Sequence, residues 1–137
     1  MDILILEDDK ILAQVFCDAL DDAGHTVTVT HRNDDAIAVM TESKFDLLVV
    51  DLLIDGETSI PVLDFANFTL PKAEVILITG SGLFPRGEMH YSISGVSYRI
   101  QKPVKLGDLV SLVEHFGRTQ STSSTDDNGP GCNQLSA

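Results

Sequence analysis

Three short, unbroken apolar runs constrain the fold of this chain more than any other feature. They occupy residues 3–6, 47–50 and 75–78 and consist only of leucine, isoleucine and valine. Runs without polar alternation are typical of strands that are buried on both faces of a parallel sheet. Segments with a helical spacing of apolar residues separate them. The sequence therefore predicts an α/β fold in three layers, with helices on both faces of the sheet.

Two less apolar strands are predicted at residues 26–30, where Thr and Val alternate, and at residues 97–101. Between residues 83 and 95, Pro85 and Gly87 disfavour a helix interior, so the fourth helix is expected to be short and irregular. The first helix is expected to turn one apolar face inward, formed by Ile11, Leu12, Val15, Phe16, Ala19, Leu20 and Ala23. The expected inner residues of the third helix are Val62, Leu63, Ala66 and Phe68.

Length and charge limit the classes of protein to which the chain can belong. Its 137 residues fit a single domain. With 21 acidic and 9 basic residues the formal net charge is −12, which argues against nucleic acid as a partner, because sequence-independent binding depends on Lys and Arg. No apolar run is long enough to cross a bilayer and no basic, apolar leader is visible. We therefore expect a cytoplasmic protein with no membrane partner.

The C-terminal segment and the two cysteines indicate where the domain ends and in which redox state the chain is expected. From Arg118 onward Ser, Thr, Asp, Asn, Gly and Pro dominate, so residues 1–117 are expected to form the domain and residues 118–137 a disordered polar tail. Cys17 and Cys132 lie far apart and lack the spacing of a CxxC motif. They are expected to be reduced thiols, as in cytosolic proteins.

Charged and polar residues follow the predicted strands directly. Glu7 and Asp8 follow the first strand, Asp51 the second buried strand, Thr79 the third, and Lys102 the last. In open α/β sheets the functional crevice lies beyond the carboxyl ends of the strands, so these groups are expected to meet there. Clustered carboxylates repel each other unless a cation is present, and Mg²⁺ suits an oxygen-only site with one or two carboxylates. Asp51 could then act as a nucleophile.

The set formed by Glu7-Asp8, Asp51, Thr79-Gly80 and Lys102-Pro103 resembles the signature of the response-regulator receiver domain of two-component and phosphorelay signalling. The resemblance extends from residue 2 to about residue 117. It implies a flavodoxin-like, doubly wound sheet of five parallel strands in the order 2-1-3-4-5. It also implies a phosphohistidine donor, on a sensor histidine kinase or a histidine phosphotransfer protein, as the partner.

The same resemblance implies a role for each site residue. Asp51 is the expected phosphoacceptor, and Lys102 and Thr79 are expected to bind the phosphoryl oxygens. Thr79 and Tyr98 form the expected switch pair, and the peptide bond before Pro103 is expected to be cis. The expected ligands of Mg²⁺ are Glu7, Asp8, Asp51 and the backbone carbonyl of Leu53. Asp55 and Ser59 depart from the family pattern, which usually has Pro and Gly at these positions.

Three functions remain open at this point. The first is a stand-alone phosphoacceptor that switches a surface for an unknown downstream protein and catalyses only its own aspartyl phosphorylation and dephosphorylation. The second is a phosphorylation-independent interaction module on the same fold. The third is a hydrolase that forms an aspartyl phosphate, as haloacid dehalogenase relatives do. Such an enzyme uses a second acid two residues after the nucleophile, where this chain has Leu53, so the third function is disfavoured.

Overall fold

A computed structural model describes residues 1–80, 93–119 and 131–134 of the chain. The expected fourth helix, between residues 83 and 95, lies largely outside the described residues. Within them the elements follow each other as β1 (Asp2–Leu6), α1 (Lys10–Asp22), β2 (Thr26–Thr30), α2 (Asn33–Glu42), β3 (Leu47–Asp51), β4 (Leu53–Ile54), β5 (Glu57–Thr58), α3 (Ile60–Thr69), β6 (Glu74–Thr79), β7 (Tyr98–Gln101), α4 (Leu106–Thr119) and β8 (Gly131–Gln134).

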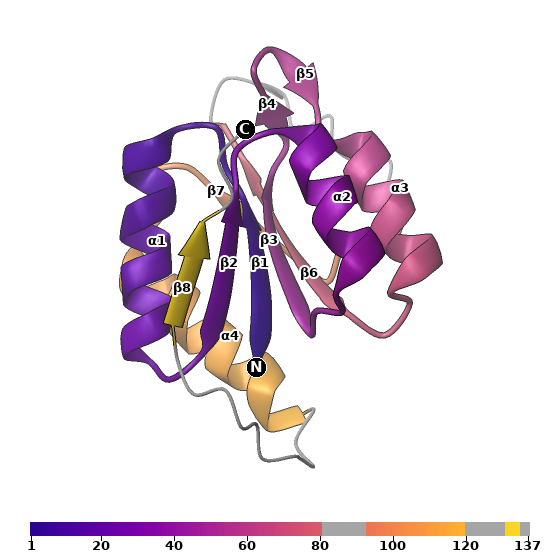
Figure 1. The fold of residues 1–137 in the computed structure, drawn as a ribbon. Coiled ribbons are helices and arrows are strands. Elements are labelled where there is room, and N and C mark those ends of the chain that lie inside the picture. The colour runs from indigo at the N-terminus through magenta and orange to yellow at the C-terminus, as the bar shows by residue number, and fades with distance from the viewer. Residues whose placement is uncertain (81–92, 120–130, 135–137) are drawn as a thin grey trace.

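The main sheet is parallel throughout, and its strand order is β7-β6-β3-β1-β2-β8. Helices α1 and α4 cover one face of the sheet and α2 and α3 cover the other (Figure 1). The five strands predicted from the sequence stand in the predicted order 2-1-3-4-5, here β2-β1-β3-β6-β7, which confirms the three-layer α/β fold. Strand β8 was not predicted.

Two apolar clusters pack on the two faces of the sheet. Ile3 and Ile5 of β1 face α1 and α4, whereas Leu4 and Leu6 face α2 and α3. All four side chains are fully buried. Successive side chains of a strand point to opposite faces, so a strand covered on both sides must be apolar at every position. This requirement explains the unbroken apolar runs in the sequence.

Helices α1 and α3 bury fewer apolar residues than the sequence predicts. The buried residues of α1 are Ala13, Phe16, Cys17 and Leu20. Ile11 is 80% exposed, and Phe68 in the last turn of α3 is 86% exposed, so the prediction that both point inward is wrong. Each residue of an α-helix advances by about 100°, and Phe68 therefore lies about 200° around the helix from the buried Ala66.

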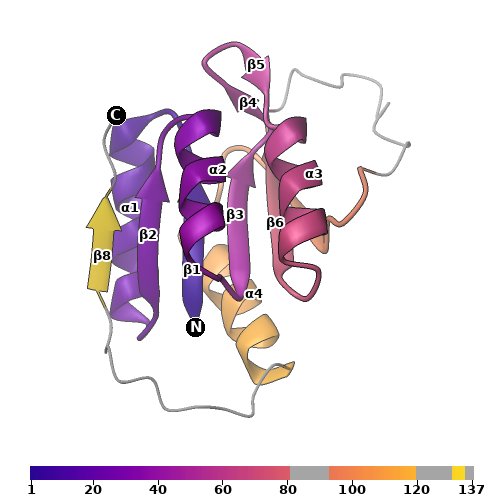
Figure 2. The ribbon, with the colours of Figure 1, turned by 45° about the vertical axis from the view of Figure 1, so that its right-hand side comes forward.

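The C-terminal segment is the largest departure from the expected fold. Helix α4 runs to Thr119, and β8 adds a sixth strand that pairs in parallel with β2 (Figures 1 and 2). Cys132 in β8 forms a disulfide with Cys17 in α1. The expectations of a disordered tail for residues 131–134 and of two free thiols are therefore wrong. An edge strand is held by backbone hydrogen bonds, and here also by a covalent bond, neither of which composition reveals.

Among the described residues, no helix combines the length and apolarity that spanning a membrane would demand.

Candidate functional site

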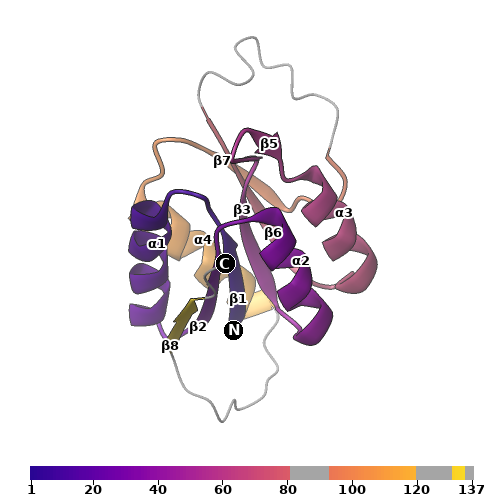
Figure 3. The same cartoon turned by 45° about the horizontal axis from the view of Figure 1, so that its top comes forward.

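The carboxyl ends of four neighbouring strands bring the predicted site residues to one edge of the sheet. Backbone hydrogen bonds continue the pairing beyond the strands. The N–H of Leu52 donates to the carbonyl of Ile78 (2.8 Å), and the N–H of Lys102 donates to the carbonyl of Thr79 (2.8 Å). These bonds place Asp51 beside β6 and Lys102 beside the end of β6. The short hairpin of β4 and β5 lies at the same end of the molecule, the end brought forward in Figure 3.

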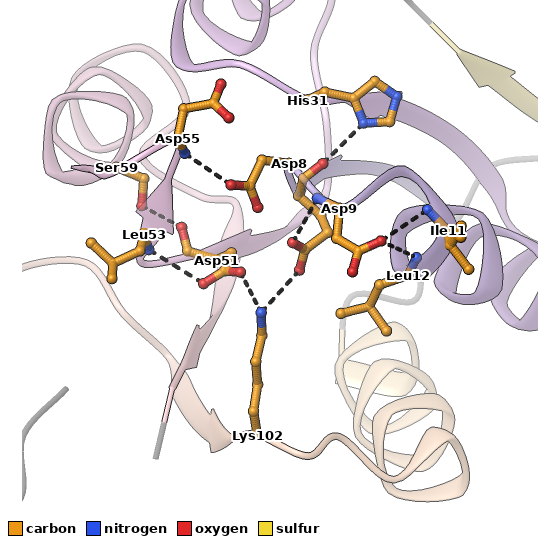
Figure 4. Close-up of polar contacts among 11 residues, drawn as sticks. Asp8, Asp9, Ile11, Leu12, His31, Asp51, Leu53, Asp55, Ser59 and Lys102 are labelled. Atoms are coloured by element: carbon orange, nitrogen blue, oxygen red, sulfur yellow. Dashed lines mark hydrogen bonds and ion pairs between the residues drawn. The ribbon is translucent and has the colours of Figure 1, made fainter. Parts of the chain in front are cut away.

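Asp51 and Lys102 form the shortest ion pair of this site. Lys102 Nζ lies 2.7 Å from Asp51 Oδ2 and 3.6 Å from Glu7 Oε1 (Figure 4). Asp51 is 4% exposed. Burial by itself would lower the pKa of Lys102, but its hydrogen bond to Asp51 and the negative charges of Glu7 and Asp51 outweigh burial and raise this pKa. Lys102 is therefore a permanent cation beside a buried carboxylate.

Glu7, Asp8 and Asp51 form an acidic cluster in which one carboxylate oxygen of each residue lies within 4.8 Å of the others. Glu7 is 1% exposed, and its Oε1 is buried without a hydrogen-bond partner. Its Oε2 accepts a hydrogen bond from the N–H of Asp9 (3.1 Å). Burial and the charge of Asp51 raise the pKa of Glu7 to about 8. An unpartnered buried oxygen in an oxygen-only donor set fits a hard divalent cation such as Mg²⁺.

Asp8 is held by the turn of the β4–β5 hairpin. The backbone N–H of Asp55 donates to Asp8 Oδ2 (2.9 Å). Burial by itself would raise the pKa of Asp8, but the hydrogen bonds from Asp55 and Glu7 outweigh it and lower this pKa. Asp55 and Gly56 both have positive φ, 51° and 81°, as in the type I′ turn that Asp-Gly pairs favour. The Asp-Gly dipeptide is thus the sequence signal of this hairpin.

Two further side chains hold the main chain of the acidic residues through hydrogen bonds, and neither role was predicted from the sequence. Ser59 Oγ donates to the backbone carbonyl of Asp51 (2.7 Å) and is fully buried. His31 Nδ1 donates to the backbone carbonyl of Glu7 (2.9 Å). Ser59 immediately precedes α3, and its side chain makes no cap hydrogen bond to that helix. Only the tertiary structure shows that these two residues hold the main chain of the acidic residues.

Leu53 and Pro103 lie where the resemblance puts them. Leu53 follows the site as the first residue of β4, and its N–H donates to Asp51 Oδ1 (3.3 Å). Its carbonyl as a metal ligand stays a prediction. The Lys102–Pro103 peptide bond is cis.

The structure does not bring Thr79 and Tyr98 together. Tyr98 pairs with Ile76, which belongs to the cluster on the α1 and α4 face, and Tyr98 is 52% exposed. Thr79 follows Ile78, which lies on that same face, so its side chain points to the other face of the sheet. In β7 the residues on the face of Thr79 are Arg99, which pairs with Leu77, and Gln101, which pairs with Thr79 itself. The expected switch pair is therefore not formed by these two residues in this structure.

Comparison with known proteins gives consistent matches. The family described as the response regulator receiver domain matches residues 3–114. The uncharacterized transcriptional regulatory protein YkoG of Bacillus subtilis is 26% identical over 124 residues, which cover 90% of this chain and 54% of that protein. The response regulator FleR of Pseudomonas aeruginosa is 26% identical over 128 residues, covering 93% of this chain and 27% of that protein. The chain thus spans about half of the first relative and about a quarter of the second.

Solved structures agree on the fold. A CheY-like receiver domain of Methanospirillum hungatei has a TM-score of 0.77 at 22% identity, with 87% of this chain and 94% of that chain covered. The response regulator TrrA of Thermotoga maritima has a TM-score of 0.71 at 17% identity, with 84% and 97% covered. Strand order, acidic edge and the match over residues 3–114 lead to one assignment: this chain belongs to the response regulator receiver domain family.

Proposed function

We propose that Asp51 accepts a phosphoryl group from a phosphohistidine of a sensor histidine kinase or a histidine phosphotransfer protein, with Mg²⁺ as the cofactor. Membership in the receiver domain family implies a phosphoacceptor function. One observation supports the finer assignment: the buried carboxylate of Asp51 lies 2.7 Å from Lys102 Nζ and within the acidic cluster with Glu7 and Asp8. This arrangement combines a nucleophile with a fixed cation.

The transfer asks the protein for positioning and charge stabilisation. One carboxylate oxygen of Asp51 bonds to phosphorus while the phosphorus–nitrogen bond of the donor breaks and the imidazole nitrogen keeps the electron pair. Ser59 and the N–H of Leu53 hold Asp51 in place. Lys102 donates to the phosphoryl oxygens as negative charge concentrates there. The hydroxyl of Thr79, at the end of β6, is a further proposed donor to these oxygens.

Glu7, Asp8, Asp51 and the carbonyl of Leu53 would hold the metal ion. When bound, Mg²⁺ would neutralise part of the negative charge of the phosphoryl group. Among the proteins with this fold, TrrA was solved in complex with Mg²⁺ and BeF, which supports Mg²⁺ as the cofactor proposed here. The unpartnered Oε1 of Glu7 supports it independently.

The phosphorylated chain would pass its signal to a downstream protein, and we place this exchange in the cytoplasm. It would catalyse only its own phosphorylation and dephosphorylation, without turnover of other phosphate esters. The interaction module that works without phosphorylation is the weaker alternative, since Asp51, Lys102 and the acidic cluster are all present and assembled.

A small-molecule phosphodonor such as acetyl phosphate, supplied with Mg²⁺, tests the assignment. Wild type is expected to gain one phosphoryl group by intact mass, and Asp51→Asn is expected to gain none, because an amide oxygen is a poor nucleophile. Asp64→Asn is the matched control: Asp64 is an exposed acid on α3, and its variant should be labelled like wild type. Equal labelling of wild type and Asp51→Asn would refute the assignment, and labelling unchanged by removal of Mg²⁺ would refute the cofactor.

A further inference from the structure

Strand β8 lies outside the residues that match the receiver family and covers an edge of the sheet. The family match ends at residue 114, whereas β8 begins at Gly131. Its residues pair in parallel with β2, from Thr26 opposite Gly131 to Val29 opposite Gln134. On its other side β2 pairs with β1. Strand β8 therefore occupies the backbone hydrogen-bonding edge that β2 would otherwise present to solvent or to another strand.

Cys132 anchors β8 in the apolar core. Cys132 is partly buried in the cluster on the α1 face, and its partner Cys17 is fully buried in α1. The remaining residues of β8 are Gly131, Asn133 and Gln134, which are glycine and polar residues. A four-residue edge strand with one apolar anchor buries little apolar surface to offset the loss of backbone entropy. Docking of β8 therefore depends on the disulfide.

We propose that the Cys17–Cys132 disulfide is a reversible lock that holds Gly131–Gln134 on the β2 edge, and that reduction by a dithiol releases this strand and opens the edge. Disulfides in reducing compartments are mostly transient or redox-sensing, and oxidising compartments retain them. The Cys17–Cys132 bond, which holds one short strand on the edge of the sheet, is suited to a transient or redox-sensing role.

The exposure of the two cysteines decides the order of the chemistry. A thiolate of the dithiol attacks Cys132 Sγ, because Cys132 is only partly buried whereas Cys17 is fully buried. The Cys17–Cys132 bond breaks, and the Cys17 sulfur leaves with the electron pair and takes up a proton. The second thiol of the dithiol then breaks the mixed disulfide and releases the Cys132 thiol. Two electrons and two protons pass from the dithiol to the protein.

Release of β8 alters the support of a strand that reaches the acidic cluster. The carbonyl of Thr30, the last residue of β2, accepts a hydrogen bond from the N–H of Glu7 (3.0 Å), and Thr30 Oγ1 donates to the carbonyl of Ile5 (2.8 Å). Cys17 lies on α1, the helix that begins directly after the acidic residues. The lock therefore joins α1 to β8, and β8 in turn pairs with β2, the strand whose last residue is hydrogen-bonded to Glu7.

Hydrogen exchange of the full chain, followed by mass spectrometry, tests the lock without any substitution. Oxidised wild type is expected to contain no thiol that can be alkylated after denaturation. On reduction with dithiothreitol, exchange of peptides covering Thr26–Thr30 is expected to accelerate by roughly tenfold or more. Peptides covering Leu47–Asp51 in β3, in the interior of the sheet, are the internal control and should stay protected at labelling times too short for global unfolding to contribute. Cys132→Ser should exchange quickly at β2 with or without the reductant.

Three outcomes would overturn the lock. Two free thiols under oxidising conditions would show that the bond does not form. A covalent dimer on a non-reducing gel would place the bond between two copies of the chain. Equal acceleration in β2 and β3 would mean that reduction loosens the whole sheet and does not release a single strand.

Discussion

Burial sets the chemistry of Glu7. Its carboxyl group is 1% exposed and faces the charge of Asp51, and together these raise its pKa to about 8. The pKa of Glu7 is therefore raised, whereas the pKa of the neighbouring Asp8 is lowered. Two acids that are adjacent in the sequence thus have pKa values shifted in opposite directions, because Glu7 is fully buried beside Asp51 whereas Asp8 is more exposed and accepts a hydrogen bond from the N–H of Asp55.

The raised pKa of Glu7 predicts a pH dependence of stability in the absence of Mg²⁺. The folded state binds the proton of Glu7 more tightly than the unfolded state, whose reference pKa is 4.5. The contribution is complete below about pH 4.5 and is lost as the pH rises to about 8, at about 1.4 kcal/mol for each unit of pKa difference. Urea unfolding of wild type and Glu7→Gln from pH 5 to pH 9 measures it.

The difference in unfolding free energy between the two proteins should shift in favour of Glu7→Gln as the pH rises, because the amide does not titrate. The exposed-acid variant Asp64→Asn should keep the dependence of wild type. A difference that stays constant over this pH range would contradict the raised pKa of Glu7.

Lys102 supplies the fixed positive charge of the site. Lys102→Met keeps a side chain of similar length and removes the ammonium group that contacts Asp51 Oδ2. We expect phosphorylation by the small-molecule donor to slow by roughly 10²-fold, the typical effect of removing one preorganised donor from a developing negative charge. Lys72→Met, in an exposed turn, is the control and should react like wild type. A rate within twofold of wild type for Lys102→Met would exclude this role.

At the scale of elements, Gly24 forms the turn that connects α1 to β2. This residue has φ of +99°, in the region that L side chains rarely adopt, and a Cβ there would meet no atom within 4 Å. Gly24→Ala should therefore lower the free energy of unfolding through the backbone alone, by about 1–2 kcal/mol. Gly107→Ala is the matched control, because Gly107 lies in α4, also has open space around its Cβ position and has no positive φ.

Gly107→Ala should be neutral or should stabilise the protein by up to ~1 kcal/mol, as alanine does in helices. Denaturant unfolding of both variants measures the contrast. If Gly24→Ala were as stable as Gly107→Ala, the left-handed turn after α1 would not be required.

The β4–β5 hairpin shows how an element can position a charge without a side chain. Its Asp55–Gly56 turn directs a backbone N–H at Asp8, and the side chain of Asn33 in α2 donates to the carbonyl of Thr58 (3.1 Å). Asp55, where the family usually has Pro, thus lies in a hairpin turn whose backbone N–H contacts Asp8.

At the scale of the whole molecule, the disulfide closes most of the chain into one loop. Cys17 and Cys132 are 115 residues apart. A bond that closes so long a loop reduces the entropy of the unfolded chain, and it contributes roughly 2–5 kcal/mol to stability. We expect reduction to lower the free energy of unfolding of wild type by this amount. Cys132→Ser should have the lower value from the outset and should not respond to the reductant.

Urea unfolding of both proteins with and without dithiothreitol measures the effect. A urea midpoint of wild type that does not change on reduction would mean that the disulfide does not lower the entropy of the unfolded chain.

The sequence by itself determined five of the six strands of the main sheet and the residues that gather at their carboxyl ends. Strands buried on both faces leave no alternation, so β1, β3 and β6 appeared as plain apolar runs. Because parallel strands end at the same edge, the residues that follow them could be grouped before any coordinates were known.

The tertiary structure decided what depends on facing and on long-range contact. It put Tyr98 and Thr79 on opposite faces, because register and pleat, not distance along the chain, set where a side chain points. It brought Ser59 and His31 behind the acidic residues and closed the Cys17–Cys132 bond across 115 residues. Local sequence patterns cannot predict such contacts, because each of these residues fits the helix, strand or loop that contains it whether or not its distant partner is present.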